Sequence, residues 1–347
     1  MKKFKKLMAI GMSVLMVFST MSVGVFASDI TNSESEFDIT TTVGPEHQIV
    51  RVFERDTEST MIAQCSAEPE ANNDYSEVKA LLLELGMEQY AIDNLTDEDL
   101  AKYAVSPRIV TSVSYSKVDN NDNVTYLEED VAIAEAAIVH NAQEVMRQNL
   151  ANGIQTIDQD TYQDSYMRVF YMVTYNWDES YTFSTDARWL TMPFFRGKDV
   201  IGSVAQDCTV TPYTSSGYVE YDWSLSTLAG YDEYSEHINM TSSQFQNTVN
   251  GSFYGSGAII ELPNDSYSDT MSVYYSNYKA HYQYDGHVNS PAEPHWFNTT
   301  GSYCHSTMKI SFNPSITISL TGVSGSLGLS GVGGSDVRKV DLEIHYT

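Results

Sequence analysis

The sequence predicts a mainly β fold, in which residues 161–347 form an antiparallel β-sandwich behind a small helical region and a disordered acidic leader, so that the whole chain is α+β. Three observations predict it. After Tyr162, apolar and polar residues alternate with the period of two that is typical of strands. Turn-forming clusters such as residues 214–217 separate these segments. Helical spacing of apolar residues is confined to residues 75–150.

Residues 1–27 have the pattern of a secretory signal peptide. Four lysines precede an apolar run over residues 7–18, and Val25 and Ala27 are small residues at the −3 and −1 positions of a cleavage site. The apolar run is shorter than the roughly 20 residues that span a bilayer. We therefore expect cleavage after Ala27, a secreted, extracellular product and no stable membrane anchor.

Residues 28–74 are rich in Ser, Thr, Glu and Asn, and their apolar residues are scattered except over residues 49–53. This composition predicts a disordered acidic leader or pro-segment.

Residues 75–106 predict two or three short helices. Val78, Leu81, Leu82 and Leu85 recur at helical spacing, and Thr96 followed by Asp99 is a capping signal. A region this small buries little core alone, so we expect it to pack on the main domain.

Residues 107–160 predict a hairpin and a long helix. A strand from Ile109 leads into an Asx-rich turn at residues 119–123 and a return strand over residues 124–127. The helix is expected over residues 128–150, with an apolar stripe formed by Val131, Ala134, Ile138, Val145 and Met146.

The sandwich strands differ in how far they are expected to be buried. Residues 166–175 are apolar on both faces, which predicts a central strand. Residues 181–189 alternate cleanly, which predicts a half-buried strand. Similar alternation marks residues 219–223, 278–284 and 339–346.

The charge balance excludes one class of partner. The chain has 46 acidic and 19 basic residues, a net charge of −27; removal of the four signal-peptide lysines leaves 46 against 15, or −31. Nucleic acid is not an expected partner, because phosphates require a basic surface.

Tyrosine is the most biased residue of the β half. Most tyrosines alternate with polar residues and are expected in the core or on sheet faces. Those expected near loops are candidate ligand-binding residues, because exposed aromatic rings stack against sugars. They are Tyr213, Tyr218, Tyr231 and Tyr234, together with Trp296.

No metal or other cofactor is expected, but two sets of residues are candidate metal ligands. His287, His295 and His305 are candidate zinc ligands in C-terminal loops, although their spacing fits no zinc motif. Asp119, Asn121, Asn123 and Asp130 partly imitate a calcium loop, in which Val124 replaces the required glycine. An ordinary Asx turn is the simpler interpretation.

Three cysteines are too few for a disulfide scaffold. Cys208 and Cys304 lie in the strand-rich half, where they either pair or remain free, and Cys65 lies in the leader.

The function that these observations favour is a non-catalytic extracellular binding or interaction protein, whose partner is a glycan or a protein. No catalytic residue is assigned, since the standard catalytic signatures are absent. One alternative is a toxin-like protein that acts on membranes through a Ser/Thr/Gly-rich hairpin at residues 315–334, apolar on one face. The other is a metal-dependent hydrolase that uses the C-terminal histidines.

Overall fold

The structure is a computed structural model that describes residues 37–55, 74–119, 121, 123–151, 164–176, 180–193, 196–227, 230–268, 270–289, 296–306, 315–321, 324–330 and 335–345. The expected signal peptide, Cys65 and His295 lie outside these residues. No helix of the described segments is long and apolar enough to cross a membrane.

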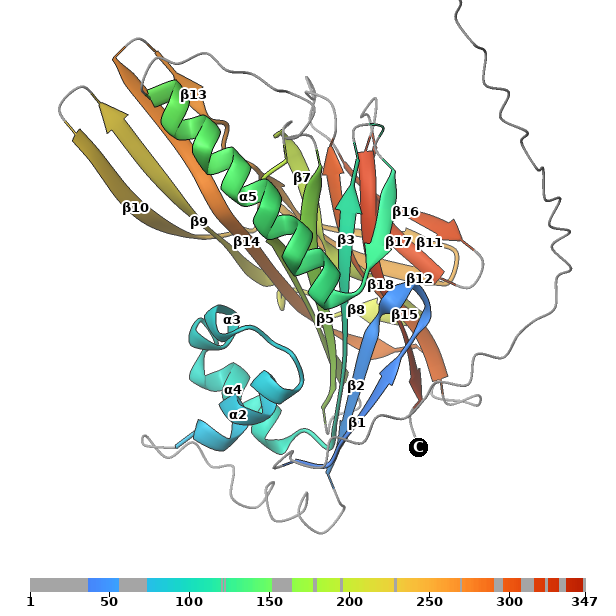
Figure 1. Cartoon of the computed structure of the whole chain (residues 1–347). Coiled ribbons are helices and arrows are strands. Elements are labelled where there is room, and N and C mark those ends of the chain that lie inside the picture. The colour runs from blue at the N-terminus through green and yellow to red at the C-terminus, as the bar shows by residue number, and fades with distance from the viewer. Residues whose placement is uncertain are drawn as a thin grey trace, which may run out of the picture.

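The predicted sandwich is confirmed: the fold is built from antiparallel sheets with a small helical part (Figure 1). The large sheet contains β1 (Ile39–Val43), β2 (Ile49–Glu54), β3 (Arg108–Val118), β4 (Val124–Leu127), β5 (Ser165–Tyr175), β6 (Ser180–Trp189), β8 (Cys208–Val210), β9 (Ser216–Thr227), β10 (Gly230–Asn239), β13 (Ser266–Tyr267) and β14 (Met271–Val288). The second sheet contains β7 (Lys198–Gln206), β11 (Phe245–Asn250), β12 (Phe253–Glu261), β15 (Trp296–Ser306) and β18 (Ser335–His345).

The main path of the large sheet runs β1-β2-β3-β5-β6-β14-β9-β10, so β10 is an edge strand. β5 is central, as predicted, and every residue of it except Tyr175 is buried. The predicted hairpin of residues 107–160 belongs to this same sheet, because β3 pairs with β5 along its whole length.

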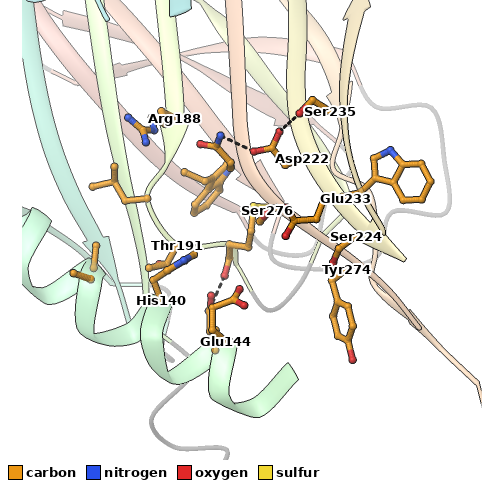
Figure 2. Close-up of a pocket in the computed structure, with 18 of the residues that line it drawn as sticks. His140, Glu144, Arg188, Thr191, Asp222, Ser224, Glu233, Ser235, Tyr274 and Ser276 are labelled. Atoms are coloured by element: carbon orange, nitrogen blue, oxygen red, sulfur yellow. Dashed lines mark hydrogen bonds between the residues drawn. The ribbon is translucent and has the colours of Figure 1, made fainter. Parts of the chain in front are cut away.

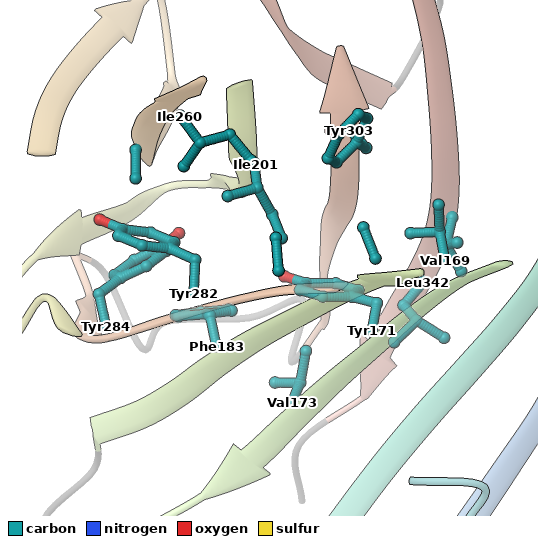
Figure 3. Packing of buried hydrophobic residues seen from close by; sticks show 14 of the residues in the cluster. Val169, Tyr171, Val173, Phe183, Ile201, Ile260, Tyr282, Tyr284, Tyr303 and Leu342 are labelled. Carbon is teal, nitrogen blue, oxygen red and sulfur yellow. The ribbon is translucent and has the colours of Figure 1, made fainter. Parts of the chain in front are cut away.

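The core between the two sheets is rich in tyrosine. The rings of Tyr171, Tyr282, Tyr284 and Tyr303 are fully buried among aliphatic residues of both sheets (Figure 3). Their hydroxyls find partners; for example, Tyr284 Oη accepts a hydrogen bond from Ser203 Oγ at 3.1 Å. This confirms that most tyrosines of the β half are structural, and it agrees with the strand preference of aromatic side chains.

The prediction of a disordered leader over residues 28–74 is wrong for residues 37–55. β1 and β2 form a hairpin around a short 3-10 turn (Pro45–His47), and β2 pairs with β3. The apolar stretch of residues 49–53 explains this difference, because Phe53 is buried beneath the helical region. Tertiary pairing thus orders a segment whose composition alone predicts disorder.

The helical region consists of α2 (Ser76–Glu84), α3 (Gln89–Asp93) and α4 (Asp97–Val105). Thr96 and Asp99 form the predicted capping box. Leu82, Ile92 and Tyr103 are completely buried in a cluster that includes residues of β3 and β5. The region therefore packs on the large sheet, on the face opposite the second sheet.

The long helix α5 (Glu129–Ala151) forms where predicted, but the predicted apolar stripe is wrong. Val131, Ile138 and Val145 are exposed, as is Ala134, and nothing is described of the Met146 side chain. The helix instead buries Ala132, Ala136 and Val139. Small alanines bring the helix close to the ring of Tyr166 in β5, and this contact outweighs burial of the larger residues.

β6 is more buried than its alternation predicts, because both of its faces are covered. Its polar residues Thr182, Ser184 and Asp186 are buried on the side of the helical region. A strand with a polar face is thus half-buried only where no second layer covers that face.

β14 contains a bulge that separates two halves of the strand. Ser276 pairs with Asp222 and Lys279 pairs with Glu220, so Asn277 and Tyr278 together oppose Tyr221. Asn277 has a φ of 53°, in the left-handed region that asparagine tolerates. The bulge accommodates one extra residue in β14 without interrupting the strand.

Residues 315–334 contain the predicted hairpin, formed by β16 (Ser315–Thr321) and β17 (Ser324–Ser330). Its apolar face, which includes Ile318 and Leu327, is buried against the second sheet. Each arm has seven residues, fewer than the 9–11 that a strand needs to span a bilayer.

Candidate functional site

A groove of about 1100 Å³ lies between α5 and the far ends of β9, β10 and β14. Figure 1 shows these strand ends projecting away from the second sheet, with α5 running across them. The groove exists because α5 packs on β5 through small residues, whereas the strands beyond β6 diverge from the helix. Figure 2 shows polar side chains converging on this space from the helix and the strands.

The strand wall of the groove follows from the pairing register. Asp222 pairs with Ser235 and Ser276, and Ser224 pairs with Glu233 and Tyr274, so each set shares one face of the sheet. Glu220 of the same face accepts a hydrogen bond from Asn94 of the helical region at 2.6 Å. The wall is therefore the helix-facing side of β9, β10 and β14.

The wall is held in place by hydrogen bonds among its own side chains. Asp222 accepts from Ser235 Oγ at 2.7 Å and from Asn277 Nδ2 at 2.9 Å (Figure 2). Tyr231 Oη donates to Glu233 Oε1 at 2.9 Å. The side chains facing a ligand are thus oriented before it arrives, which reduces the entropy lost on binding.

The opposite wall is formed by α5 and the end of β6. His140, Gln143 and Glu144 line it from the helix, and Arg188 lines it from β6. Arg188 donates to Glu88 at 2.9 Å, so its charge is already balanced. Glu144, Asp222 and Glu233 therefore give the groove a negative field, which favours neutral or cationic ligands.

One of the five predicted ligand-binding residues directs its aromatic ring into the groove. Tyr231 is 59% exposed and lies on the wall facing α5. Tyr234 is exposed and borders the groove, but its pairing with Trp223 places both rings on the reverse face, where they stack at 4.2 Å. Both residues lie in β10 and not in a loop.

The other three residues do not join them. Tyr218 was predicted near a loop, but it is buried in β9, where its ring stacks against His237 and His281. Tyr213 is fully exposed outside the groove, and Trp296 is exposed at the start of β15 in the second sheet. The structure therefore does not bring the five residues together as one site.

The candidate zinc ligands are not gathered either. His305 is not in a loop as expected; it lies in β15, buried, with its Nδ1 2.9 Å from Asp199. His287 is exposed in β14 of the other sheet. Within the described segments, no three His, Cys, Asp or Glu side chains are grouped in a way that would hold a metal ion.

The calcium-like turn is closed by its own hydrogen bonds. Asp119 Oδ1 accepts from the backbone N–H of Asn121 at 2.8 Å and of Asn123 at 3.0 Å. Hydrogen bonds from the Asn123 side chain and backbone lower the pKa of Asp119. Asp130 lies in the first turn of α5, where it accepts from Val131 N–H. These contacts are those of an Asx turn.

Both described cysteines are free and buried. Cys208 lies in the core between the two sheets, whereas Cys304 lies in the cluster beneath the β16–β17 hairpin. Burial raises the pKa of each thiol to about 12, so neither is a reactive nucleophile.

A second buried histidine lies beneath the helical region. His281 Nδ1 is 2.8 Å from Asp186, and both side chains are almost completely buried. Burial alone lowers the pKa of His281, but the charge of Asp186 and its hydrogen bond raise the pKa above the ordinary value. His305 shows the same balance beside Asp199.

These two pairs predict a pH dependence of stability. Because the folded-state pKa values are raised, both histidines stabilise the protein fully below about pH 6.5, and this contribution is lost as the pH rises through the folded-state pKa values. We expect the melting temperature, followed by circular dichroism, to fall on going from pH 6 to pH 9. His281→Gln should reduce the slope, and His140→Gln, at an exposed position on α5, should leave it unchanged. A flat or rising profile would contradict this assignment.

Comparisons with known proteins identify no family. No family model matches the chain, and no curated protein matches it. Among the solved structures that resemble it are two weak matches. AvmM, which catalyses macrocyclization in alchivemycin A biosynthesis, has a TM-score of 0.24 and 7% identity, covering 48% of this chain and 81% of that one. The group B streptococcus pilus 2b backbone protein has a TM-score of 0.16 and 6% identity, covering 47% and 74%. Likeness at this level carries no argument about function.

Proposed function

We propose that this chain is a secreted, non-catalytic binding protein whose groove between α5 and the β9–β10–β14 strand ends takes a neutral oligosaccharide. The N-terminal signal pattern supports export. The observation that carries the proposal is the convergence of hydroxyl, amide and carboxylate groups with an exposed tyrosine ring in one groove.

The chemistry of a sugar suits these groups. Carboxylates such as Asp222 and Glu233 accept hydrogen bonds from hydroxyl groups, and the serines both donate and accept. The Tyr231 ring offers an apolar surface to the C–H face of a pyranose. Polar groups are repeated along the groove, which therefore suits an extended oligosaccharide better than a compact apolar molecule.

The negative field narrows the class of sugar. An oligosaccharide that carries uronic acids or sulfates would place its charges near Glu144, Asp222 and Glu233, and like charges in a partly desolvated site repel. We therefore expect neutral oligosaccharides to bind and acidic ones not to bind.

Calorimetric titration of oligosaccharides selected on a glycan array tests this proposal. Tyr231→Ala is expected to weaken binding about tenfold, a loss of about 1.4 kcal/mol. Tyr213→Ala is the matched control, because it removes an exposed tyrosine outside the groove and should leave affinity unchanged. If neutral and acidic sugars both fail to bind, or if both variants weaken binding equally, the proposal is wrong.

A further inference from the structure

β10 presents an open backbone edge over its whole length. Within the described part of the chain it pairs only with β9, and nine of its ten residues are exposed. The register with β9 is continuous from Gly230 to Asn239, so no bulge interrupts the strand. Figure 1 shows β10 as the outermost strand of the projecting end. Long, regular edges of this kind are usually blocked by proline, lysine or a bulge.

The pairing with β9 determines which residues of β10 offer their backbone. Met240, just after β10, donates its N–H to Gly217 O at 2.9 Å and therefore faces β9. Backbone groups alternate in direction along an antiparallel strand. The outward-facing N–H and C=O groups consequently belong to Tyr231, Glu233, Ser235, His237 and Asn239.

The side chains of β10 indicate which strand would pair there. Asp232, Glu233 and Glu236 are acidic, and the strand contains no lysine or arginine. A second copy of this chain would bring the same three acids to the edge, and like charges on paired strands are destabilising. A strand that carries positive charges would instead be attracted.

We propose that the free edge of β10 binds an extended, cationic peptide segment of a partner protein, which adds to the large sheet as an antiparallel strand. Main-chain hydrogen bonds to the five outward-facing residues would supply affinity, and the three acids would select for lysine or arginine. This interaction is separate from oligosaccharide binding in the groove, although the added strand would lie beside the groove wall.

A designed peptide provides the probe. Ten residues that oppose Asn239 to Gly230 in antiparallel order, with lysine opposite Asp232, Glu233 and Glu236 and threonine or valine elsewhere, match both the edge and its charge. The same peptide N-methylated at the residues opposite Glu233, Ser235 and His237 keeps every charge but loses the donors. We expect the unmodified peptide to bind the full-length protein at least about tenfold more tightly, since each lost backbone hydrogen bond weakens binding.

A matched pair of variants locates the site on the protein. Ser235→Pro removes one outward N–H and leaves the ladder to β9 intact, whereas Ser235→Ala loses the same hydroxyl but keeps the N–H. We expect only the proline variant to lose the peptide, with its circular dichroism unchanged. On peptide binding, hydrogen exchange should slow at the outward amides and not at the amides of Asp232, Tyr234 and Glu236.

Several outcomes would overturn the proposal. Equal binding of the two peptides would show that charge attraction alone is responsible, and equal binding to the two Ser235 variants would place the peptide elsewhere. Absence of binding would exclude the edge as a peptide site. A dimer that Ser235→Pro converts to a monomer would show that a second copy occupies the edge. Oligosaccharide binding, measured separately, reports on the groove, so failure of one proposal is distinguishable from failure of the other.

Discussion

Replacing Asp199 with alanine is expected to lower the free energy of unfolding by about 3–5 kcal/mol. Asp199 is completely buried in β7, and its carboxylate accepts hydrogen bonds from three groups of β15. Tyr303 Oη donates at 2.6 Å, His305 Nδ1 lies at 2.9 Å and the backbone N–H of Ser306 donates at 3.2 Å. Alanine leaves these groups in a buried space without their acceptor, and His305 loses the charge that balances it.

Urea unfolding followed by tryptophan fluorescence measures this loss. Asp199→Asn, which keeps the volume and one acceptor oxygen, should cost less than Asp199→Ala. Asp232→Ala, at an exposed position in β10, is the control and should change stability by no more than about 0.5 kcal/mol. A loss of unfolding free energy below about 1 kcal/mol for Asp199→Ala would show that the Asp199–His305 pair does not stabilise the sandwich.

Leu327→Ala is expected to cost about 2–5 kcal/mol, because Leu327 is completely buried beneath the β16–β17 hairpin. The leucine fits against the glycines of the second sheet. A side-chain carbon placed on Gly202, Gly255 or Gly257 would lie only 2.8–2.9 Å from the Leu327 methyl groups. Alanine would leave this space unfilled, and the sheet backbone is unable to close it.

The same hairpin supplies the control. Leu320, near its turn, is 46% exposed, so Leu320→Ala should cost less than about 1 kcal/mol. Thermal unfolding of both variants by calorimetry makes the comparison. Equal losses would mean that the hairpin is not seated on the second sheet as described, and the membrane-acting alternative would then regain support.

Local sequence patterns predicted the helices and strands better than they predicted which other elements cover them. Residues 166–175 are apolar on both faces, which predicts β5 and its burial, because such a strand requires two covering layers. The same logic underestimates the burial of Asp186, since no local pattern shows that α2–α4 lie over β6. The α5 stripe failed for a related reason: the ring of Tyr166 in β5, not the helix itself, decides which face packs.

The groove was predictable only in part. Tyr231 and Tyr234 were predicted to be exposed because they were expected near loops, and they are exposed, but on an edge strand. The alternation of β9 already places Glu220 and Asp222 on one face. Nothing in the sequence links that face to His140 and Glu144, because their approach depends on how α5 crosses the sheet. Tyr218 was misplaced since a tyrosine beside a turn at residues 214–217 has no local signal of burial between two histidines.

The bulge in β14 has a consequence for how the groove is able to change. Because Asn277 stands outside the regular pleat, Tyr274 and Ser276 face the groove while Tyr275 faces the reverse side. If Asn277 entered the ladder instead, the strand before it would turn over, and Tyr275 and Val273 would line the groove. The core half of β14, from Tyr278 onward, would keep its orientation. Val273 and Tyr275 would then take the places of Tyr274 and Ser276, so the β14 part of the wall would become less polar with no residue replaced.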